Sequence, residues 1–218
     1  MARVRGPLPP RVSAPDLPRE FETAHGLGPR TDLLGARVVS LEGHVDAVHS
    51  TLAECAIAEA SVDSLDLTGA ALADVEIVSL RATELLARDG RWRNVAVDGG
   101  RVGTLDLSGA ELDSVELRGV RIDYLSLRGA TVRDVLVSGC VVGTLDLPLA
   151  TLSRVRFEDS RAEEVASDGL RAEHVDLRGL EALVYGRPDS LRGVTLSHRQ
   201  VELAAADFAR ALGIDVQD

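Results

Sequence analysis

The side chains that most often carry chemistry in proteins form no catalytic or metal-binding pattern in this sequence. None of the five histidines has ligand spacing with another histidine or with either of the two cysteines. The glycines recur at regular intervals and do not form a phosphate-binding loop between a strand and a helix. Nothing marks a serine as a nucleophile. We therefore expect no catalytic residue, no metal site, no cofactor and no enzyme activity.

Negative charge, in contrast, follows a regular pattern. Four aspartates stand at multiples of twenty residues from one another, namely Asp46, Asp66, Asp106 and Asp146. Residues 45–184 contain 25 acidic residues and 14 arginines, so they carry a net charge of −11, which equals that of the whole chain. A regular row of carboxylates could imitate the spaced phosphates of duplex DNA. Whether these aspartates form a row depends on the elements that hold them.

A five-residue frame organises residues 65–149. An apolar or small residue recurs at the first and third place of each five, and four fives make a unit of twenty, as shown by Leu65, Leu85, Leu105, Leu125 and Leu145. A helical period would drift against this frame, and strict strand alternation fails at every fifth residue. The chain must therefore turn after each five, so that four short extended segments close one coil and successive coils stack. We number the faces so that residues 65–69 form the first.

This pattern resembles the pentapeptide-repeat family, whose loose motif is Ala-(Asp/Asn)-Leu-x-x with the leucine pointing inward. The central leucine place is occupied here by Leu67, Leu72, Ile77, Leu107, Leu112, Leu117, Ile122, Leu127, Val132, Val137 and Leu147. The resemblance covers residues 45–184 and implies an all-β fold, a right-handed quadrilateral parallel β-helix of seven coils. Five-fold regularity excludes a leucine-rich repeat and a hexapeptide β-helix.

Two departures from a uniform coil are expected. Trp92 occupies a central place and is larger than its neighbours, which predicts a distorted coil over residues 85–104. Glycines such as Gly69 and Gly99 close the first and third faces, whereas residues such as Asp74 and Tyr124 close the other two. Because glycine tolerates positive φ and larger residues do not, we expect two corner geometries that alternate around each coil.

Composition agrees with a narrow tube and limits the partners. Apolar residues make up 45% of the chain but aromatic residues only 3%, as expected where stacked Leu, Val and Ala fill the core. The net charge of −11 argues against direct binding to nucleic acid or to an anionic membrane. Cys55 and Cys140 lie more than four coils apart, on the order of 20 Å, and are predicted to be buried thiols and not a disulfide. No signal peptide or transmembrane run is recognisable, so we expect a cytoplasmic protein.

The two ends of the chain depart from the repeat. Residues 1–30 hold six of the eight prolines, and we expect a disordered, Pro-rich segment or an extended tail. Residues 31–44 are predicted to form an N-terminal cap. Residues 185–218 are predicted to form a C-terminal cap with one α-helix, because Ser197 and Gln200 have capping-box spacing. Its apolar stripe is expected to cover the end of the tube: Val201, Ala204, Ala205, Phe208 and Leu212.

These patterns favour a non-catalytic protein-binding module. Among pentapeptide-repeat proteins the best-understood activity is protection or inhibition of DNA gyrase by an acidic, DNA-like dimer, so the resemblance implies a topoisomerase as partner and a role in antibiotic resistance. The alternative is a structural scaffold that binds another protein. An acidic row is also ordinary on the solvated outside of a β-helix, and we favour that interpretation because opposite faces share the charge.

Apolar residues at outward places add a second candidate contact surface. Leu136, Val141 and Leu149 fall within fifteen residues of one another and are candidate partner-binding residues. Leu203 projects from the polar side of the predicted C-terminal helix, which makes it the candidate residue for a homodimer contact.

Overall fold

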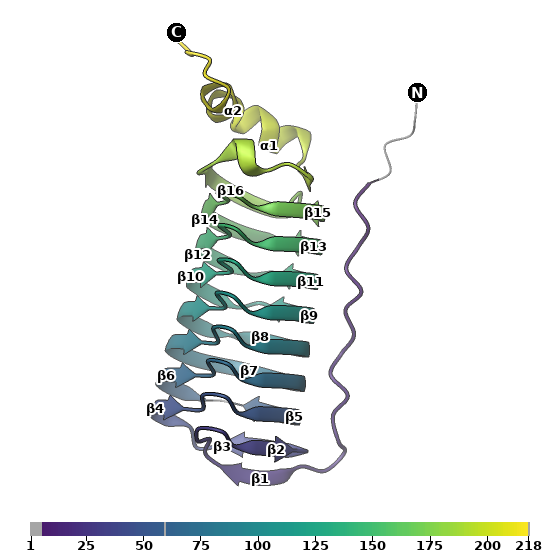
Figure 1. The fold of residues 1–218 in the computed structure, drawn as a ribbon, viewed down its shortest axis with the longest axis vertical. Coiled ribbons are helices and arrows are strands. Elements are labelled where there is room, and N and C mark those ends of the chain that lie inside the picture. The colour runs from purple at the N-terminus through teal and green to yellow at the C-terminus, as the bar shows by residue number, and fades with distance from the viewer. Residues whose placement is uncertain (1–5, 59, 218) are drawn as a thin grey trace.

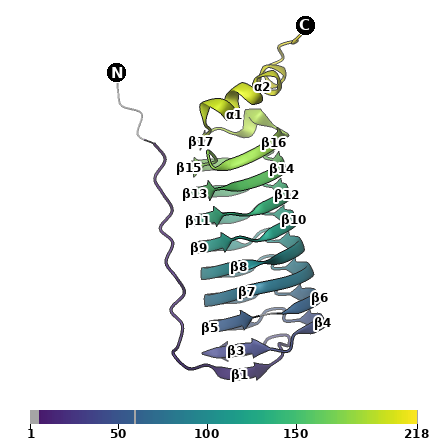
Figure 2. The same cartoon turned by 180° about the vertical axis from the view of Figure 1, so that it is seen from behind.

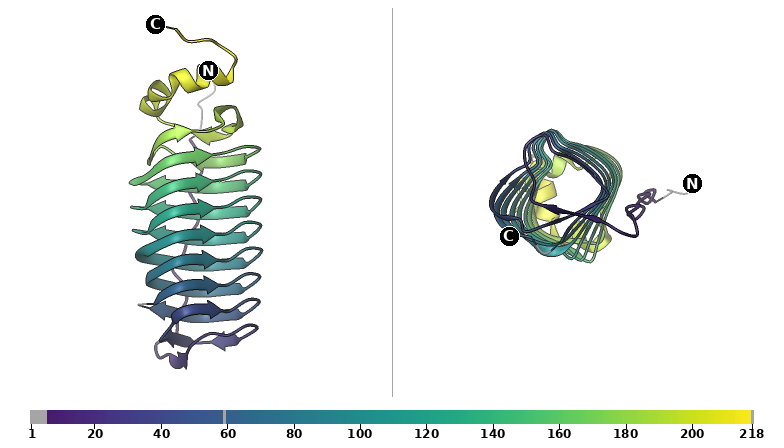
Figure 3. Two further views of the ribbon diagram at one scale, coloured as in Figure 1. Left: turned by 90° about the vertical axis from the view of Figure 1, so that its left-hand side faces the viewer. Right: turned by 90° about the horizontal axis from the view of Figure 1, so that it is seen from below.

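The computed structural model of the chain describes residues 6–58 and 60–217. It is mostly parallel β-sheet wound into a β-solenoid of about eight turns, with two short helices at the C-terminal end. The coils stack along one long axis (Figure 1), and the view along this axis shows a four-sided tube (Figure 3). The predicted fold class, a quadrilateral parallel β-helix, is confirmed.

The strands follow one another along the solenoid, and the helices come last (Figure 1). The bounds are β1 Glu22–His25, β2 Asp32–Leu34, β3 Ala36–Val39, β4 Glu42–Asp46, β5 Thr51–Ala58, β6 Ser61–Asp66, β7 Ala71–Leu86, β8 Arg91–Asp106, β9 Glu111–Arg118, β10 Arg121–Ser126, β11 Thr131–Ser138, β12 Val141–Asp146, β13 Thr151–Glu158, β14 Ser160–Ala166, β15 Arg171–Asp176, β16 Leu180–Tyr185, a 3-10 helix Pro188–Ser190, β17 Val194–Thr195, α1 His198–Leu203 and α2 Ala205–Ala211.

Strand pairing fixes a register of twenty residues. Leu105 pairs with Leu85 on one side and with Leu125 on the other, and Leu125 pairs in turn with Leu145. These leucines are therefore stacked neighbours, as the sequence predicted. Each coil thus donates and accepts parallel backbone hydrogen bonds along its whole length.

The core is a continuous column of side chains from the first and third places of each five. Leu65 and Leu67 are fully buried, and their equivalents in later coils remain so. Trp92 is accommodated without a register shift, because it pairs with Leu72 and Leu112 at the usual spacing of twenty. A Cβ at Gly90 would lie 3.0 Å from the Ala70 carbonyl oxygen and 3.1 Å from that of Ala87, so glycine there relieves a close approach of the backbone and not a contact with the indole. The predicted distortion of this coil is not seen in its pairing.

The two cysteines are buried free thiols, as predicted. Cys140 Sγ lies 3.4 Å from the carbonyl oxygens of Leu117 and Ser138, where it can donate a weak hydrogen bond. Burial raises the pKa of both thiols. These cysteines therefore act as small core residues.

The prediction of alternating corner types is wrong. The second-face corners adopt the left-handed backbone conformation without glycine, with φ of 55° at Asp74 and 56° at Asn94, close to the 68° of Gly69. Asn and Asp enter this region more readily than other non-glycine residues, which explains the substitution. Three of the four corners are left-handed in most coils, and the fourth, at positions such as Tyr124, is not.

The N-terminal cap includes more of the chain than residues 31–44. β1 pairs with β3, while Ala24 and Leu27 pack on the first core layer. β2 and β3 both pair with β5, with an offset of nineteen residues instead of twenty. The offset changes at Gly43 and His44, where a bulge lies between β4 and β6. This bulge explains why the frame becomes regular only at Val45.

The segment before β1 is extended and ordered where the structure describes it. Residues 6–21 run outside the tube alongside the coils (Figure 2), and Arg11 N donates to Asp134 Oδ1 over 2.9 Å. Residues 6–21 thus take the extended conformation, one of the two sequence alternatives for residues 1–30. The physical reason is that corner side chains of several coils satisfy the backbone of this segment. Residues 1–5 lie outside the described residues.

The C-terminal cap contains two short helices and not one. Ser197 forms the predicted capping box with Gln200, and the helix breaks at Ala204 before α2 begins. Ala204 is buried and Phe208 packs on the core, whereas the other members of the predicted stripe, Val201, Ala205 and Leu212, are exposed. The Gln200 amide nitrogen donates to the Leu177 and Leu180 carbonyls, each over 2.7 Å. The helices therefore cap the tube partly through a polar contact.

The stacked core predicts a large cost for truncation of Leu105. Leu105→Ala should lower the free energy of unfolding by about 2–5 kcal/mol, because the hydrogen-bonded wall of the tube cannot collapse into the gap. Urea denaturation followed by circular dichroism measures this cost. Leu34→Ala, at an exposed position, is the matched control and should change stability by less than about 0.5 kcal/mol. Equal effects of the two substitutions would contradict the inward position of Leu105.

Candidate functional site

The predicted aspartates share one face, but only Asp46 and Asp66 are direct neighbours, because Leu86 and Ser126 interrupt the row on the two sides of Asp106. The carboxylates also hold the turns between faces. Oδ1 of Asp66 accepts a hydrogen bond from the Thr68 amide over 2.9 Å, and Oδ1 of Asp106 accepts one from the Ser108 amide over 3.0 Å. Asp46 accepts from Val48 in the same way. These are Asx-type turns, in which the side chain imitates a backbone acceptor. The repeat of aspartate at this place thus has a structural cause.

Arginine neutralises part of this row. Asp106 lies 3.8 Å from the Arg88 guanidinium, and Asp146 lies 3.5 Å from that of Arg128. Asp146 is only 6% exposed and accepts a hydrogen bond from the Tyr124 hydroxyl over 2.9 Å. Burial raises the pKa of Tyr124, and the hydrogen bond to Asp146 raises it further. The accessible negative charge of the row is therefore concentrated toward the N-terminal coils.

The three outward apolar residues do not form one patch. Leu136 lies on β11 and is half-buried between Glu116 and Arg156 of the neighbouring coils. Val141 begins β12 on the next face, and Leu149 lies at the corner that follows the end of β12. Leu136, Val141 and Leu149 are thus on different sides of one coil, and the structure does not bring them together.

The C-terminal end of the tube presents a broader apolar surface. Leu183 on β16 is 80% exposed and Leu203 on α1 is 77% exposed. Five other large apolar side chains are exposed at the same end of the molecule: Val184, Val201, Leu212, Ile214 and Val216. We call these five residues, together with Leu183 and Leu203, the C-terminal end surface. Exposed apolar residues this concentrated on one end of a molecule are typical of an interaction site.

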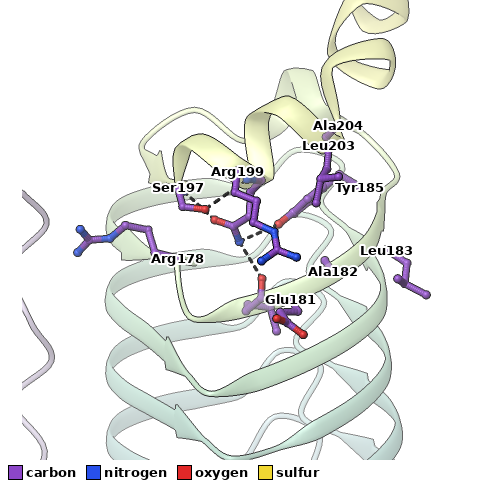
Figure 4. A pocket seen from close by; sticks show the side chains of 11 residues that line it. Arg178, Glu181, Ala182, Leu183, Tyr185, Ser197, Arg199, Leu203 and Ala204 are labelled. Atoms are coloured by element: carbon purple, nitrogen blue, oxygen red, sulfur yellow. Dashed lines mark hydrogen bonds between the residues drawn. The ribbon is translucent and has the colours of Figure 1, made fainter.

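A cavity lies within this surface, between β16 and α1 (Figure 4). Its volume is about 380 Å³. Leu203, Ala182 and Tyr185 contribute to its lining, and Arg178, Glu181 and Arg199 add charged groups. Burial raises the pKa of the Tyr185 hydroxyl, which the Gln200 amide approaches to 3.4 Å. The cavity combines apolar walls with a few polar groups, as ligand and partner pockets commonly do.

The outer edge of β16 is the second feature of this end. β16 pairs with β14 on its inner side, and within the described residues no strand pairs with its outer side. Only the Leu180 carbonyl at its start is satisfied by the cap, through Gln200. An unpaired edge of this kind can accept a strand from another chain.

Sequence reasoning found Leu203 but missed Leu183 and Val184. These two occupy the outward fourth and fifth places of the last five, where earlier coils carry Gly103 with Thr104 and Glu163 with Glu164. The apolar residues at both of these outward places are the sequence signal that could have identified Leu183 and Val184. The exposure of Val201 and Leu212 could not be read from the sequence, because it depends on the break between the helices.

Two comparisons with known proteins find no relative of this chain. A scan against models of protein families finds no match, and a search of curated proteins finds none. Across the described residues, no group of three or more histidine, cysteine and acidic side chains is arranged to hold a metal ion. None of the helices described is long and apolar enough to cross a membrane.

Acid should weaken the coil below the C-terminal end surface. Asp176 is buried and accepts hydrogen bonds of 2.8 and 2.6 Å from Arg178, which hold its pKa below the usual 3.8. A depressed pKa contributes stability that is present above the unfolded value and lost as pH falls through the folded value. We therefore expect Asp176→Asn to cost about 1 kcal/mol at pH 7 and to cost progressively less below pH of about 4.

Urea unfolding at several pH values checks this dependence. Asp63→Asn is the matched control, because Asp63 is exposed and forms no ion pair with any described residue. A cost of Asp176→Asn that stays the same from neutral to acid pH would show that the charge of Asp176 contributes nothing.

Proposed function

We propose that this protein is a non-catalytic protein-binding module that associates through its C-terminal end surface. The observation that carries the proposal is the exposure of Leu183 and Leu203 beside the unpaired edge of β16. In the coils below this end, strands pair with those of adjacent coils and most apolar residues are buried in the tube, with Val141 and Leu149 among the exposed exceptions. Covering this end would remove both apolar surface and open hydrogen-bonding groups from water.

A second copy of the chain is the partner proposed for this surface. In a two-fold dimer each copy offers the same patch, so an unpaired edge meets an identical edge and antiparallel pairing satisfies both. Such a dimer would join two tubes end to end. It would also bury Leu203, the residue proposed for the dimer contact.

DNA gyrase, or a related topoisomerase, is proposed as the partner of the coils themselves, with the protein acting as an acidic DNA mimic. The supporting observation is that the net charge of −11 is carried by residues 45–184, while the flanking segments are neutral overall. Asp46 and Asp66, which form no ion pair within the described residues, would lead this contact. The alternative is a scaffold that binds a protein other than a topoisomerase through apolar residues.

Leu203→Glu should disrupt the proposed dimer without disturbing the tube, because Leu203 is exposed in the single chain. Light scattering at micromolar concentration should show a dimer for the unaltered chain and a monomer for the variant. Leu34→Glu, at an exposed place on β2 at the opposite end of the tube (Figure 1), is the matched control and should remain dimeric. A monomeric unaltered chain would contradict the proposed dimer.

The gyrase proposal predicts a position-specific effect of charge. The protein should inhibit DNA supercoiling by gyrase of the same organism, or relieve quinolone poisoning. Replacement of Asp46, Asp66 and Asp106 together by Asn should weaken the effect severalfold, since Asn retains an acceptor for the turn but removes the charge.

The control changes the same number of charges at exposed places on other faces, with Glu111, Glu163 and Glu173 replaced together by Gln. Equal losses of the effect on gyrase in the two variants would indicate a response to net charge alone. This result would contradict a specific role of the aspartate row. An unaltered, folded protein without any effect on gyrase would favour the scaffold.

A further inference from the structure

The N-terminal segment before β1 crosses several coils along one corner of the tube (Figures 1 and 2). Arg11 N donates to Asp134, Ser13 N to Ser114 over 3.2 Å, and Asp16 N to Asp74 over 3.0 Å. Between these contacts, the Ser13 hydroxyl and the Ala14 carbonyl meet the side-chain amide of Asn94. The segment thus makes contact with four consecutive coils.

The receiving residues occupy one place in the repeat. Asp74, Asn94, Ser114 and Asp134, which we call the corner ladder, close the second face of successive coils, each with φ between 53° and 57°. Left-handed corners turn these short polar side chains outward. Asn94 also bonds to Asp74 and to Ser114, so these three residues form a connected row along the axis of the tube, while Asp134 accepts two hydrogen bonds of 2.6 Å from the Arg154 guanidinium.

The spacing of the ladder matches an extended polypeptide. Three coil steps separate Asp134 from Asp74, a distance of about 14 Å if each step equals the spacing of neighbouring strands. Five residues separate Arg11 from Asp16, which in a polyproline II conformation span about 15 Å. The segment contains Pro9, Pro10 and Pro15, which favour this conformation. Any chain of this conformation can therefore present backbone groups to successive coils.

The contacts involve the backbone of the segment more than its side chains. Apart from the Ser13 hydroxyl, the donors and the acceptor at the ladder are main-chain atoms. No side chain of residues 6–21 is fully buried. A segment held by peripheral hydrogen bonds without an apolar anchor opens at low cost. The ladder consequently contacts an extended backbone and does not require the particular side chains of residues 6–21.

We propose that the corner ladder is a docking site for an extended, proline-rich segment of another polypeptide, and that residues 6–18 occupy it in cis. The chemistry of the occupant follows from residues 6–18, which contain five prolines and in which the charges of Arg11 and Asp16 cancel. This site is independent of the C-terminal end surface and of the acidic row on the first face. A partner must displace the chain's own segment, which competes at an effective concentration of about 1 mM.

The test uses the full chain with a weakened N-terminal segment. Ser13→Pro with Asp16→Pro removes two of the amide donors and keeps the extended conformation. The probe is a fluorescein-labelled synthetic peptide with the natural sequence of residues 6–18, followed by fluorescence anisotropy. We expect the peptide to bind the Pro variant at least about tenfold more tightly than the unaltered chain, because three competing hydrogen bonds are lost, those of the Ser13 and Asp16 amides and that of the Ser13 hydroxyl.

Glycine substitutions show where the peptide binds. In the Pro variant, Asp74→Gly, Asn94→Gly and Ser114→Gly together remove three ladder side chains at positions where glycine suits the positive φ. Peptide binding should then fall at least about tenfold. The matched control places Gly at three left-handed corners away from the ladder, Ser79, Asp89 and Asp159, and should keep full binding.

A peptide that carries the same two proline substitutions should not bind, and circular dichroism confirms that every variant retains the β-solenoid. The proposal is overturned if the peptide does not bind the Pro variant, or if ladder and control glycines affect binding equally.

Discussion

Parallel hydrogen bonding between residues twenty apart is the constraint on which the rest of this molecule depends. Once Leu105 is bonded between Leu85 and Leu125, every residue has a fixed neighbour above and below it. The side chains at one place of the repeat then form a column, inside the tube for the core and outside it for the corner ladder. A one-residue slip would break all columns together, which makes the register cooperative.

The same constraint explains why the surfaces proposed to bind partners are located at an end and at a corner of the tube. Within the coils, backbone groups are satisfied by adjacent coils, so only side chains remain available to a partner. At the C-terminal end the stacking stops, and β16 keeps an unpaired outer edge under a cap that covers it only in part. At the second-face corner, short polar side chains form a row with a spacing that suits an extended chain.

The sequence was sufficient to predict the stack and its interior, because the five-residue frame is a direct record of inward and outward places. It did not predict the corners correctly, since left-handed backbone at Asp74 and Asn94 depends on the turn and not on the presence of glycine. Nor could it place residues 6–21, because the contact of Arg11 with Asp134 joins residues more than one hundred positions apart. Leu203 was found from helical periodicity, whereas the exposure of Val201 depends on the break at Ala204.

Amide hydrogen exchange, measured as a function of protein concentration, tests whether rigid coils carry separate binding surfaces at one end and at one corner of the tube. The account predicts slow exchange from β5 to β15 at all concentrations and fast exchange at residues 11–16. It also predicts that β16 and α1 exchange quickly in dilute solution and become protected as concentration rises. Concentration-independent exchange at β16 and α1, or coils that exchange as fast as residues 11–16, would contradict the account.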